Sequence, residues 1–355
     1  MTRKPITQVA TTDIQEMMNP GPERRMDLPG FADEFVDFPH YIIRITERIW
    51  HDREVDKCLD WYAEDCAIHT MAGDICGAQT VVDNTWATLE AFPDRRLDAD
   101  NVIWSEEGDG AFYSSHLITS KMTNEGRSEF GPVTGKQIRI QTIAECLCKD
   151  NRVIEEWLVR DNLAAVQQLG FDPDRVAKDQ AQTDKINSFS LIDFHAENRA
   201  ATVAGDQAKT DTSPTIALAA HALRLCFSQS GLDELQDVYD FRVAAQFPGD
   251  VPLYGPDQME TWRNSFLAAL PDLKLSIDHV AEIPYLGDAK DVSLRWSAVG
   301  THSGAGCYGA PSDAPIYILG VSHFRIMNGR IREQVTIWDD IALRRQIATA
   351  RYQSG

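Results

Sequence analysis

The chain has 355 residues, of which 43 % are hydrophobic and 25 % charged. This composition is that of an ordinary globular protein and excludes a disordered, collagen-like or coiled-coil chain. The net charge of −20 repels phosphate backbones and anionic lipids, so we expect binding to neither nucleic acid nor membrane. No apolar run approaches the roughly 18–20 residues of a membrane helix, and the N-terminus has no apolar signal segment, which favours a cytoplasmic protein.

Seven cysteines form no disulfide framework, because their number is odd and their spacing irregular. Cys146 and Cys148 form a C-x-C pair within a strand-like run, unlike the C-x2-C of a zinc site. In a reducing cytoplasm, buried free thiols are the better interpretation. The nine histidines include no H-x3-H or H-E-x2-H motif, so the sequence predicts no metal site.

The predicted elements begin after an irregular arm, residues 1–31, that is rich in proline and glycine. Apolar residues three to four positions apart predict a helix around residues 41–49. A helix over 80–91 is ended by Pro93, and Asp161 is a plausible N-cap for the last helix. The full predicted order is helices 41–49 and 55–61, strand 66–71, helix 80–91, strands 98–105, 110–120, 136–149 and 153–160, and helix 161–169.

An internal repeat determines the predicted architecture. Residues 89–102 (LEAFPDRRLDADNV) match residues 267–280 (LAALPDLKLSIDHV) at an offset of 178, with seven identities. The same offset aligns residues 152–169 with residues 330–347. We therefore predict an arm (1–31), a first domain (32–170), a linker with at most a helical turn or short docking segment (171–213) and a second domain (214–355). Helices followed by a meander of strands predict α+β domains with helices on one face of an antiparallel sheet.

The order of elements and several short motifs resemble the SnoaL-like polyketide cyclase and ester cyclase branch of the nuclear transport factor 2-like superfamily. The resemblance rests on FPDRRL (92–97), FYSSH (112–116) and EEWLVRDNLAAVQQLG (155–170), and on GTHSG (300–304) and NGRIREQVTIWDD (328–340) in the second repeat. It implies two tandem cone-shaped domains, each with a curved sheet around an apolar pocket, and no metal or organic cofactor. It also implies packing of the outer sheet faces, here as an intrachain pseudo-dimer, with a homodimer of whole chains as a second option.

Within this family the resemblance implies an acid/base carboxylate on the last strand, which moves a proton next to a carbonyl. The family position corresponds to Leu158, with Thr336 in the second repeat, and neither can transfer a proton. Glu156, one pleat earlier on the same strand face, is the predicted replacement. The alternative is a strand-end carboxylate paired with Arg160.

Two histidines complete the predicted catalytic set. His116 shares a strand face with Ser114 and can polarise a carbonyl or assist Glu156. The alternative is a hydrogen-bonded histidine on the outer sheet face. His69 in DCAIHT lies where relatives place a histidine near the pocket mouth, and a turn-stabilising role is about as plausible.

Six further residues are predicted to bind substrate, although packing explains some of them equally well. Tyr62 aligns with Tyr239 of the second repeat, which also suits a shared packing role, and His302 also suits the organisation of a hairpin. The recurring Asp161 and Asp339 are explained by helix capping without chemistry. The predicted substrate-binding residues are Tyr62, Trp104, Thr142, Arg160, His302 and Trp338.

The sequence thus favours a cofactor-independent enzyme that performs proton transfer, such as cyclisation, isomerisation or hydration. Its substrate is a small or medium carbonyl, ester or lactone compound bound in the first cone. The alternative is a non-catalytic protein of the same fold that binds a small apolar ligand or serves assembly. Position 158 and the carboxylate-poor second repeat (Gln334, Thr336, Trp338) favour that alternative.

Overall fold

A computed structural model describes residues 5–231 and 234–353. The described chain divides into two compact units. The first comprises the residues up to Thr70 together with Asp74–Leu158, and the second comprises Met71–Gly73 and the residues from Val159 onward. This division separates the end of the last strand of the first repeat, and the helix that follows it, from the rest of that repeat.

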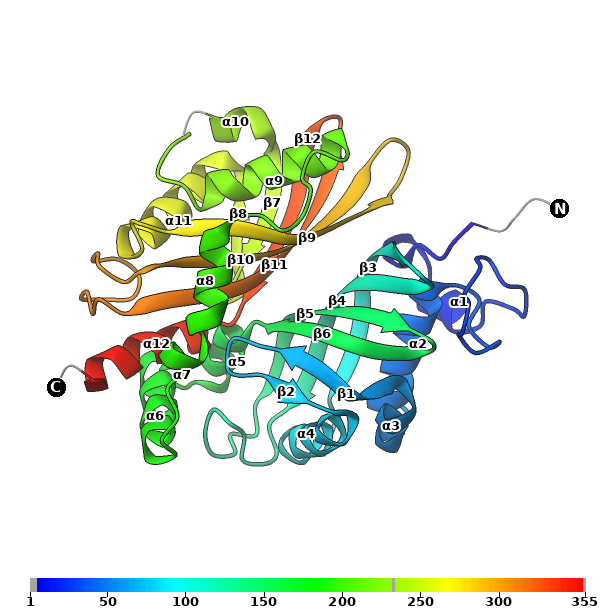
Figure 1. Cartoon of the computed structure of the whole chain (residues 1–355), viewed down its shortest axis with the longest axis horizontal. Coiled ribbons are helices and arrows are strands. Elements are labelled where there is room, and N and C mark those ends of the chain that lie inside the picture. Colours follow the sequence, from blue (N-terminus) through cyan, green and yellow to red (C-terminus); the bar gives the residue numbers. More distant parts are fainter. Residues whose placement is uncertain (1–4, 232–233, 354–355) are drawn as a thin grey trace. The chain divides into compact units, whose positions relative to one another are not determined.

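The first sheet has six strands in the order β2-β1-β6-β5-β4-β3 (Figure 1). β1–β2, β3–β4 and β4–β5 are antiparallel, but β1 pairs with β6 in parallel, which the predicted antiparallel sheet did not include. The helix and four strands between β1 and β6 provide the long connection that parallel pairing requires. The strands are β1 (Tyr62–His69), β2 (Ile75–Cys76), β3 (Arg96–Gly108), β4 (Ala111–Thr123), β5 (Gln137–Lys149) and β6 (Arg152–Arg160).

The second sheet repeats this arrangement in the order β8-β7-β12-β11-β10-β9. Its registers correspond to those of the first sheet: Tyr62 pairs with Val153, and Tyr239 pairs with Ile331. The predicted equivalence of Tyr62 and Tyr239, and the tandem α+β fold, are therefore confirmed. The strands are β7 (Tyr239–Phe247), β8 (Val251–Tyr254), β9 (Lys274–Pro284), β10 (Lys290–Thr301), β11 (Pro315–Met327) and β12 (Arg330–Trp338).

Local sequence signals explain where the helices of the first unit begin. α2 starts after Asp37, whose side chain accepts a hydrogen bond from the backbone N–H of His40, and Pro39 occupies the first turn. α4 starts after Gly77, which has φ +88° and approaches the backbone oxygen of Glu64 too closely for a Cβ atom. The helices are α1 (Ile14–Met18), α2 (Phe38–Trp50), α3 (Cys58–Trp61) and α4 (Ala78–Ala91), with short 3-10 helices at Val9–Thr11 and Val55–Lys57.

The segment predicted as a linker is more helical than expected. Asp172 caps α6 and is followed by Pro173, and α6 buries Val176, Ala177 and Ala181 on one side. Small apolar residues spaced for one helical face were enough to order this polar sequence. The helices from this point are α5 (Asn162–Leu169), α6 (Pro173–Ile186), α7 (Leu191–Phe194), α8 (Ala196–Ala204), α9 (Pro214–Cys226), α10 (Leu235–Val238), α11 (Gly255–Ala269) and α12 (Asp340–Gln353).

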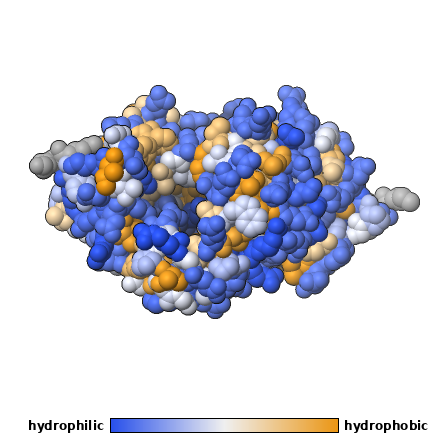
Figure 2. Space-filling view, turned by 90° about the horizontal axis from the view of Figure 1, so that it is seen from below, coloured by the Kyte–Doolittle hydropathy of each residue, from blue (hydrophilic) through white to orange (hydrophobic). Residues whose placement is uncertain are grey.

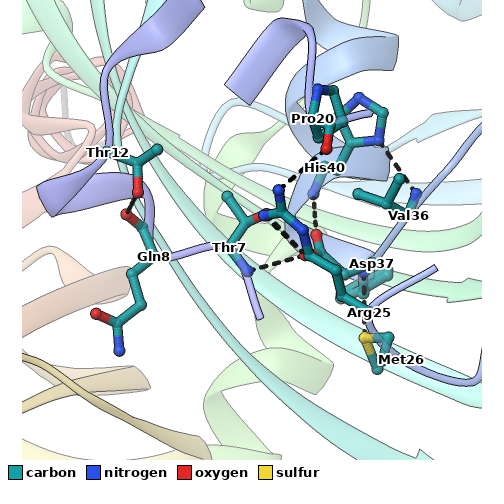
Figure 3. Close-up of polar contacts among 10 residues, drawn as sticks. Thr7, Gln8, Thr12, Pro20, Arg25, Met26, Val36, Asp37 and His40 are labelled. Atoms are coloured by element: carbon teal, nitrogen blue, oxygen red, sulfur yellow. Dashed lines mark hydrogen bonds and ion pairs between the residues drawn. The ribbon is translucent and has the colours of Figure 1, made fainter. Parts of the chain in front are cut away.

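The N-terminal arm is irregular, as predicted, yet it belongs to the core of the first unit. Leu28 and Phe31 are buried in the same apolar cluster as α2 and the sheet. Figure 3 shows the polar contacts that fasten it around Asp37. One carboxylate oxygen of Asp37 accepts hydrogen bonds from the backbone N–H (2.8 Å) and hydroxyl (2.7 Å) of Thr7, and the Arg25 guanidinium lies 3.9 Å from that oxygen.

The surface visible in Figure 2 is mostly hydrophilic, with small scattered hydrophobic areas. Within the described ranges, no helix combines the length and hydropathy needed to cross a bilayer. All seven cysteines are free; five are buried, as expected, but Cys76 and Cys307 are exposed.

Candidate functional site

The face of the first sheet that packs against α2, here called the first inner face, carries the candidate site. Val102, Phe112 and Cys146 pack in one cluster with α2, which identifies their side of the sheet. Ser114 pairs with Cys146, and His116 pairs with Val102. Since directly paired residues project to the same side of a sheet, Ser114 and His116 lie on the first inner face. The alternative placement of His116 on the outer sheet face is therefore not the one adopted.

Glu156 is buried, with 6 % of its surface exposed. Its counterpart Gln334 pairs with Phe324, the counterpart of Cys146, so Glu156 lies in the row that contains Cys146 and Ser114. Burial and the negative charge of Glu156 raise the pKa values of the Cys58 and Cys66 thiols to about 12. The thiols and phenols around Glu156 are therefore neutral.

Tyr62 and Cys146 belong to the same surroundings. Burial, followed by the charge of Glu156, raises the pKa of the Tyr62 phenol and of the Cys146 thiol well above their ordinary values. A neutral phenol donates hydrogen bonds at physiological pH. The structure thus places the predicted catalytic Glu156 and the predicted substrate-binding Tyr62 in one electrostatic environment.

Several polar atoms on or facing the first inner face make no hydrogen bond to any described part of the chain. They are Tyr41 Oη, Ser114 Oγ, His116 Nε2 and Thr142 Oγ1. Thr142 lies on this face because it pairs with Ile118, two residues from His116. A buried polar atom without a partner costs about 1–3 kcal/mol, so native proteins rarely keep one that water or a ligand does not satisfy. Four such atoms on one face make it the place in the first unit where water or a ligand would be held.

His116 and Glu156 are on the same face but not in contact range. They lie on β4 and β6, which β5 separates, so their backbones are about 10 Å apart across the sheet. The predicted direct assistance of Glu156 by His116 does not suit this spacing. The two side chains can instead contact different atoms of one bound molecule.

The buried imidazole of His116 makes stability depend on pH. Burial lowers its pKa from 6.5 to about 3, so below pH 6.5 the unfolded chain binds a proton that the folded chain does not. The free energy of unfolding should therefore fall as pH drops below 6.5, by up to about 1.4 kcal/mol per pH unit. His116→Gln should remove this contribution in urea titrations between about pH 4.5 and 6.5. An unchanged slope would contradict the assignment, and His221→Gln at an exposed position is the control.

His69 is not brought together with Glu156. Ile68 is the residue that pairs with Glu156, while His69 pairs with Trp157 on the opposite face. The His69 ring nitrogens contact Asp74 (3.2 Å) and Glu155 (3.0 Å), and the hydrogen bond to Asp74 is the main cause that raises its pKa. This geometry matches the turn-stabilising alternative.

Two other predicted binding residues occupy different surroundings. Trp104 is partly buried on the first inner face and packs edge-on against Phe38, with ring centroids 6.3 Å apart. Arg160 ends β6 and belongs to the second unit, where its Nε atom is buried and makes no hydrogen bond with the described chain.

The corresponding inner face of the second unit is filled by aromatic side chains. Ile118 and Thr142 of the first sheet correspond to Trp296 and Gly320, so the glycine makes room for an indole. Trp338, a predicted binding residue, is fully buried against Phe266 (5.5 Å between ring centroids) and Trp296 (6.0 Å). These residues serve as core.

Most polar groups on the second inner face satisfy one another, and the buried Nε1 atom of Trp338 is one that makes no hydrogen bond with the described chain. Tyr239 donates to Gln334 (2.8 Å), Gln334 donates to Thr336 (2.8 Å), and Trp296 donates to Ser322 (3.0 Å). Ser322 and Thr336 share a further hydrogen bond of 2.9 Å. The position of Glu156 is thus occupied by a neutral amide with internal partners. The two inner faces differ in filling, charge and polar satisfaction.

His302 and the recurring aspartates have structural contacts. The Nδ1 atom of His302 lies 2.9 Å from Ser312 Oγ, and its backbone oxygen accepts two N–H bonds within the β10–β11 connection, which matches the hairpin alternative. Asp161 and Asp339 accept hydrogen bonds from Ala164 and Ala342, as predicted for caps. In the part of the chain that the structure describes, no three His, Cys, Asp or Glu side chains are grouped to hold a metal ion.

Sequence reasoning missed Tyr41 and the thiols as neighbours of the site. Tyr41 was read as one apolar position of an amphipathic helix, and the cysteines as inert core. The period-two spacing of Cys146 and Cys148 with the strand pattern was the available signal for a common face.

The chain belongs to the SnoaL-like polyketide cyclase family, whose pattern matches residues 40–169 and 217–347. No curated protein matches the sequence. Family membership confirms the resemblance and indicates cyclase- or isomerase-type chemistry in general terms.

Among solved structures, three similar proteins each match about one repeat. AclR from Streptomyces galilaeus is 18 % identical (TM-score 0.33), covering 37 % of this chain and 94 % of its own. TsrD from Streptomyces laurentii is 16 % identical (TM-score 0.33), and the match covers 37 % of this chain and 93 % of TsrD. A SnoaL-like polyketide cyclase from Agrobacterium tumefaciens is 16 % identical (TM-score 0.32), covering 37 % and 97 %.

Proposed function

We propose that the first unit is a cofactor-independent enzyme that transfers protons on a small or medium carbonyl, ester or lactone compound. The observation that carries the proposal is the buried Glu156 carboxylate on a face with four unsatisfied polar atoms. The second unit, with Gln334 at the matching position, serves as a structural repeat. We further propose that the protein acts in the cytoplasm and that its two repeats pair as an intrachain pseudo-dimer.

In the proposed reaction, Glu156 accepts a proton from the carbon next to the substrate carbonyl. The electron pair of the broken C–H bond moves to the carbonyl oxygen, and neutral hydroxyl donors such as Tyr62 stabilise the resulting enolate. Return of the proton to another carbon completes an isomerisation. Alternatively, the enolate carbon attacks a second carbonyl, whose oxygen becomes an alkoxide and takes the proton back from Glu156, which completes a cyclisation.

The test measures deuterium exchange. Wild-type protein is incubated in D2O with a panel of aryl ketones and β-keto esters, and deuterium at the α-carbon is quantified by mass spectrometry. Glu156→Gln keeps the size of the side chain but removes the base, so we expect exchange to fall at least about 100-fold. Unfolding by urea should change little.

The matched control is Glu155→Gln. Glu155 is the preceding residue, contacts His69 and lies on the opposite face of β6, so the variant should keep wild-type exchange. Equal exchange rates in wild type and Glu156→Gln would refute the assignment of Glu156. Compounds that bind without any exchange above the solvent rate would favour the non-catalytic binding protein.

A further inference from the structure

A buried phenol outside the predicted site has no explanation in the packing alone. Tyr41, on α2, is fully buried, and its hydroxyl makes no hydrogen bond with the described residues. The thiols of Cys148 and Cys146, both on the first inner face, act electrostatically on the phenol. The phenol therefore lies near β5, next to the row that contains Glu156.

The end of the N-terminal arm and the segment that joins it to α2 contact the Tyr41 ring from the other side. Phe31 and Phe35 each meet the ring edge to face, with centroids 4.9 Å away and interplanar angles of 86° and 89°. Phe31 also contacts Phe112 of β4 at 5.7 Å. Two perpendicular ring contacts on one phenol leave its orientation little freedom.

Hydrogen bonds hold the chain in place on both sides of the contact between Phe31, Phe35 and Tyr41. Asp37 binds Thr7 and lies near Arg25 on one side, as Figure 3 shows. On the other side, the backbone N–H of Ala32 donates to Asn151 in the β5–β6 turn at 3.2 Å. The Arg24 guanidinium closes the intervening loop by donating to the backbone oxygens of Leu28, Phe31 and Ala32.

The family match begins at residue 40, so the arm lies outside the matched residues. Packing alone does not account for the unpartnered Tyr41 hydroxyl, because a phenylalanine would pack there without the cost of a buried hydroxyl. A ligand oxygen on the first inner face would satisfy it.

We propose that Tyr41 donates a hydrogen bond to an oxygen of the ligand on the first inner face, and that Phe31 of the arm and Phe35, which lies between the arm and α2, are positioning residues for it. The ligand class is an apolar ring compound with a carbonyl or other acceptor oxygen. The proposal rests on the proposed function for the presence of a ligand there, but not on proton transfer by Glu156.

The test uses one probe, 6-propionyl-2-(dimethylamino)naphthalene, a fluorescent aryl ketone whose emission moves to longer wavelength when its carbonyl accepts a hydrogen bond. For Tyr41→Phe we expect about five- to tenfold weaker binding and emission of the bound probe at shorter wavelength. The urea midpoint should stay equal or rise, because the variant removes an unsatisfied hydroxyl. A lower midpoint with unchanged affinity would overturn the proposal, and so would a wild-type protein that does not bind the ketone.

Tyr239→Phe is the matched control. Tyr239 is equally buried, but its hydroxyl donates to Gln334 in the second unit. This variant should lower the urea midpoint and leave probe binding unchanged. A lower urea midpoint in Tyr239→Phe shows a hydroxyl that stabilises the fold. An equal or higher midpoint in Tyr41→Phe, together with weaker probe binding, shows a hydroxyl that serves the ligand.

Phe31→Leu tests the role of the arm. We expect about threefold weaker probe binding in the wild-type background and no further loss in the Tyr41→Phe background, because the arm acts through the phenol. Additive losses would show that the arm does not position Tyr41. Since the readout is binding, loss of deuterium exchange in Glu156→Gln neither supports nor refutes this proposal.

Discussion

Replacing Asp37 with alanine is expected to destabilise the first unit by about 3–5 kcal/mol and to release the N-terminal arm. Asp37 is completely buried, caps α2 through the N–H of His40 and accepts two hydrogen bonds from Thr7. Loss of the cap alone costs about 1 kcal/mol. The larger part comes from removing the carboxylate that faces Arg25 in a buried site.

Two measurements check this result. Urea unfolding gives the loss of stability, and trypsin cleavage after Arg24 and Arg25 reports whether the arm has detached. Asp13→Ala is the control, because Asp13 also caps a helix, α1, but at an exposed position, and should cost less than about 1 kcal/mol. Equal losses in the two variants would show that the Asp37 contacts do not fasten the arm.

Replacing Gly320 with alanine is expected to destabilise the second unit by about 3 kcal/mol. A Cβ atom at Gly320 would lie 2.2–2.5 Å from three atoms of the Trp296 indole. Trp296 is fully buried, donates to Ser322 and packs on Phe227 with ring centroids 4.7 Å apart. The indole must therefore move, and its hydrogen bond and ring contacts are lost together.

Near-ultraviolet circular dichroism should show the disturbed tryptophan environment, and urea unfolding should show the lower stability. Gly309→Ala is the control: its Cβ would meet nothing within 4 Å, but its φ is +79°. That variant measures backbone strain alone, about 1 kcal/mol. A Gly320→Ala variant as stable as wild type would mean that aromatic filling of the second inner face is not tight.

The repeat and the strand pattern were sufficient to predict the fold. Two copies of the same order of elements at one offset are a property of the sequence, and the matching registers at Tyr62 and Tyr239 follow from it. Capping by Asp161 was also predictable, since a cap depends on residues within one turn. The parallel pairing of β1 with β6 was not, because it joins segments far apart in the chain.

The candidate site was predicted only in part. Strand alternation placed Glu156 and Leu158 on one face, and the structure puts Glu156 on the buried inner side. Strand alternation could not predict that His69 lies on the opposite face, since that depends on the pairing of Ile68 with Glu156. Nor could it distinguish Thr142 with a free hydroxyl from Trp338 in a filled core.

The sequence by itself determined the tandem α+β architecture and the cap residues, and it predicted Glu156 as the acid/base residue. The tertiary structure alone decided that the first inner face keeps four unsatisfied polar atoms, and that Tyr41 and the arm pack on the face that carries Glu156. The physical reason is the sequence separation over which each kind of interaction acts. Periodicity and capping act between near neighbours in the chain, whereas burial and hydrogen-bond satisfaction depend on side chains from distant segments that meet only in the folded protein.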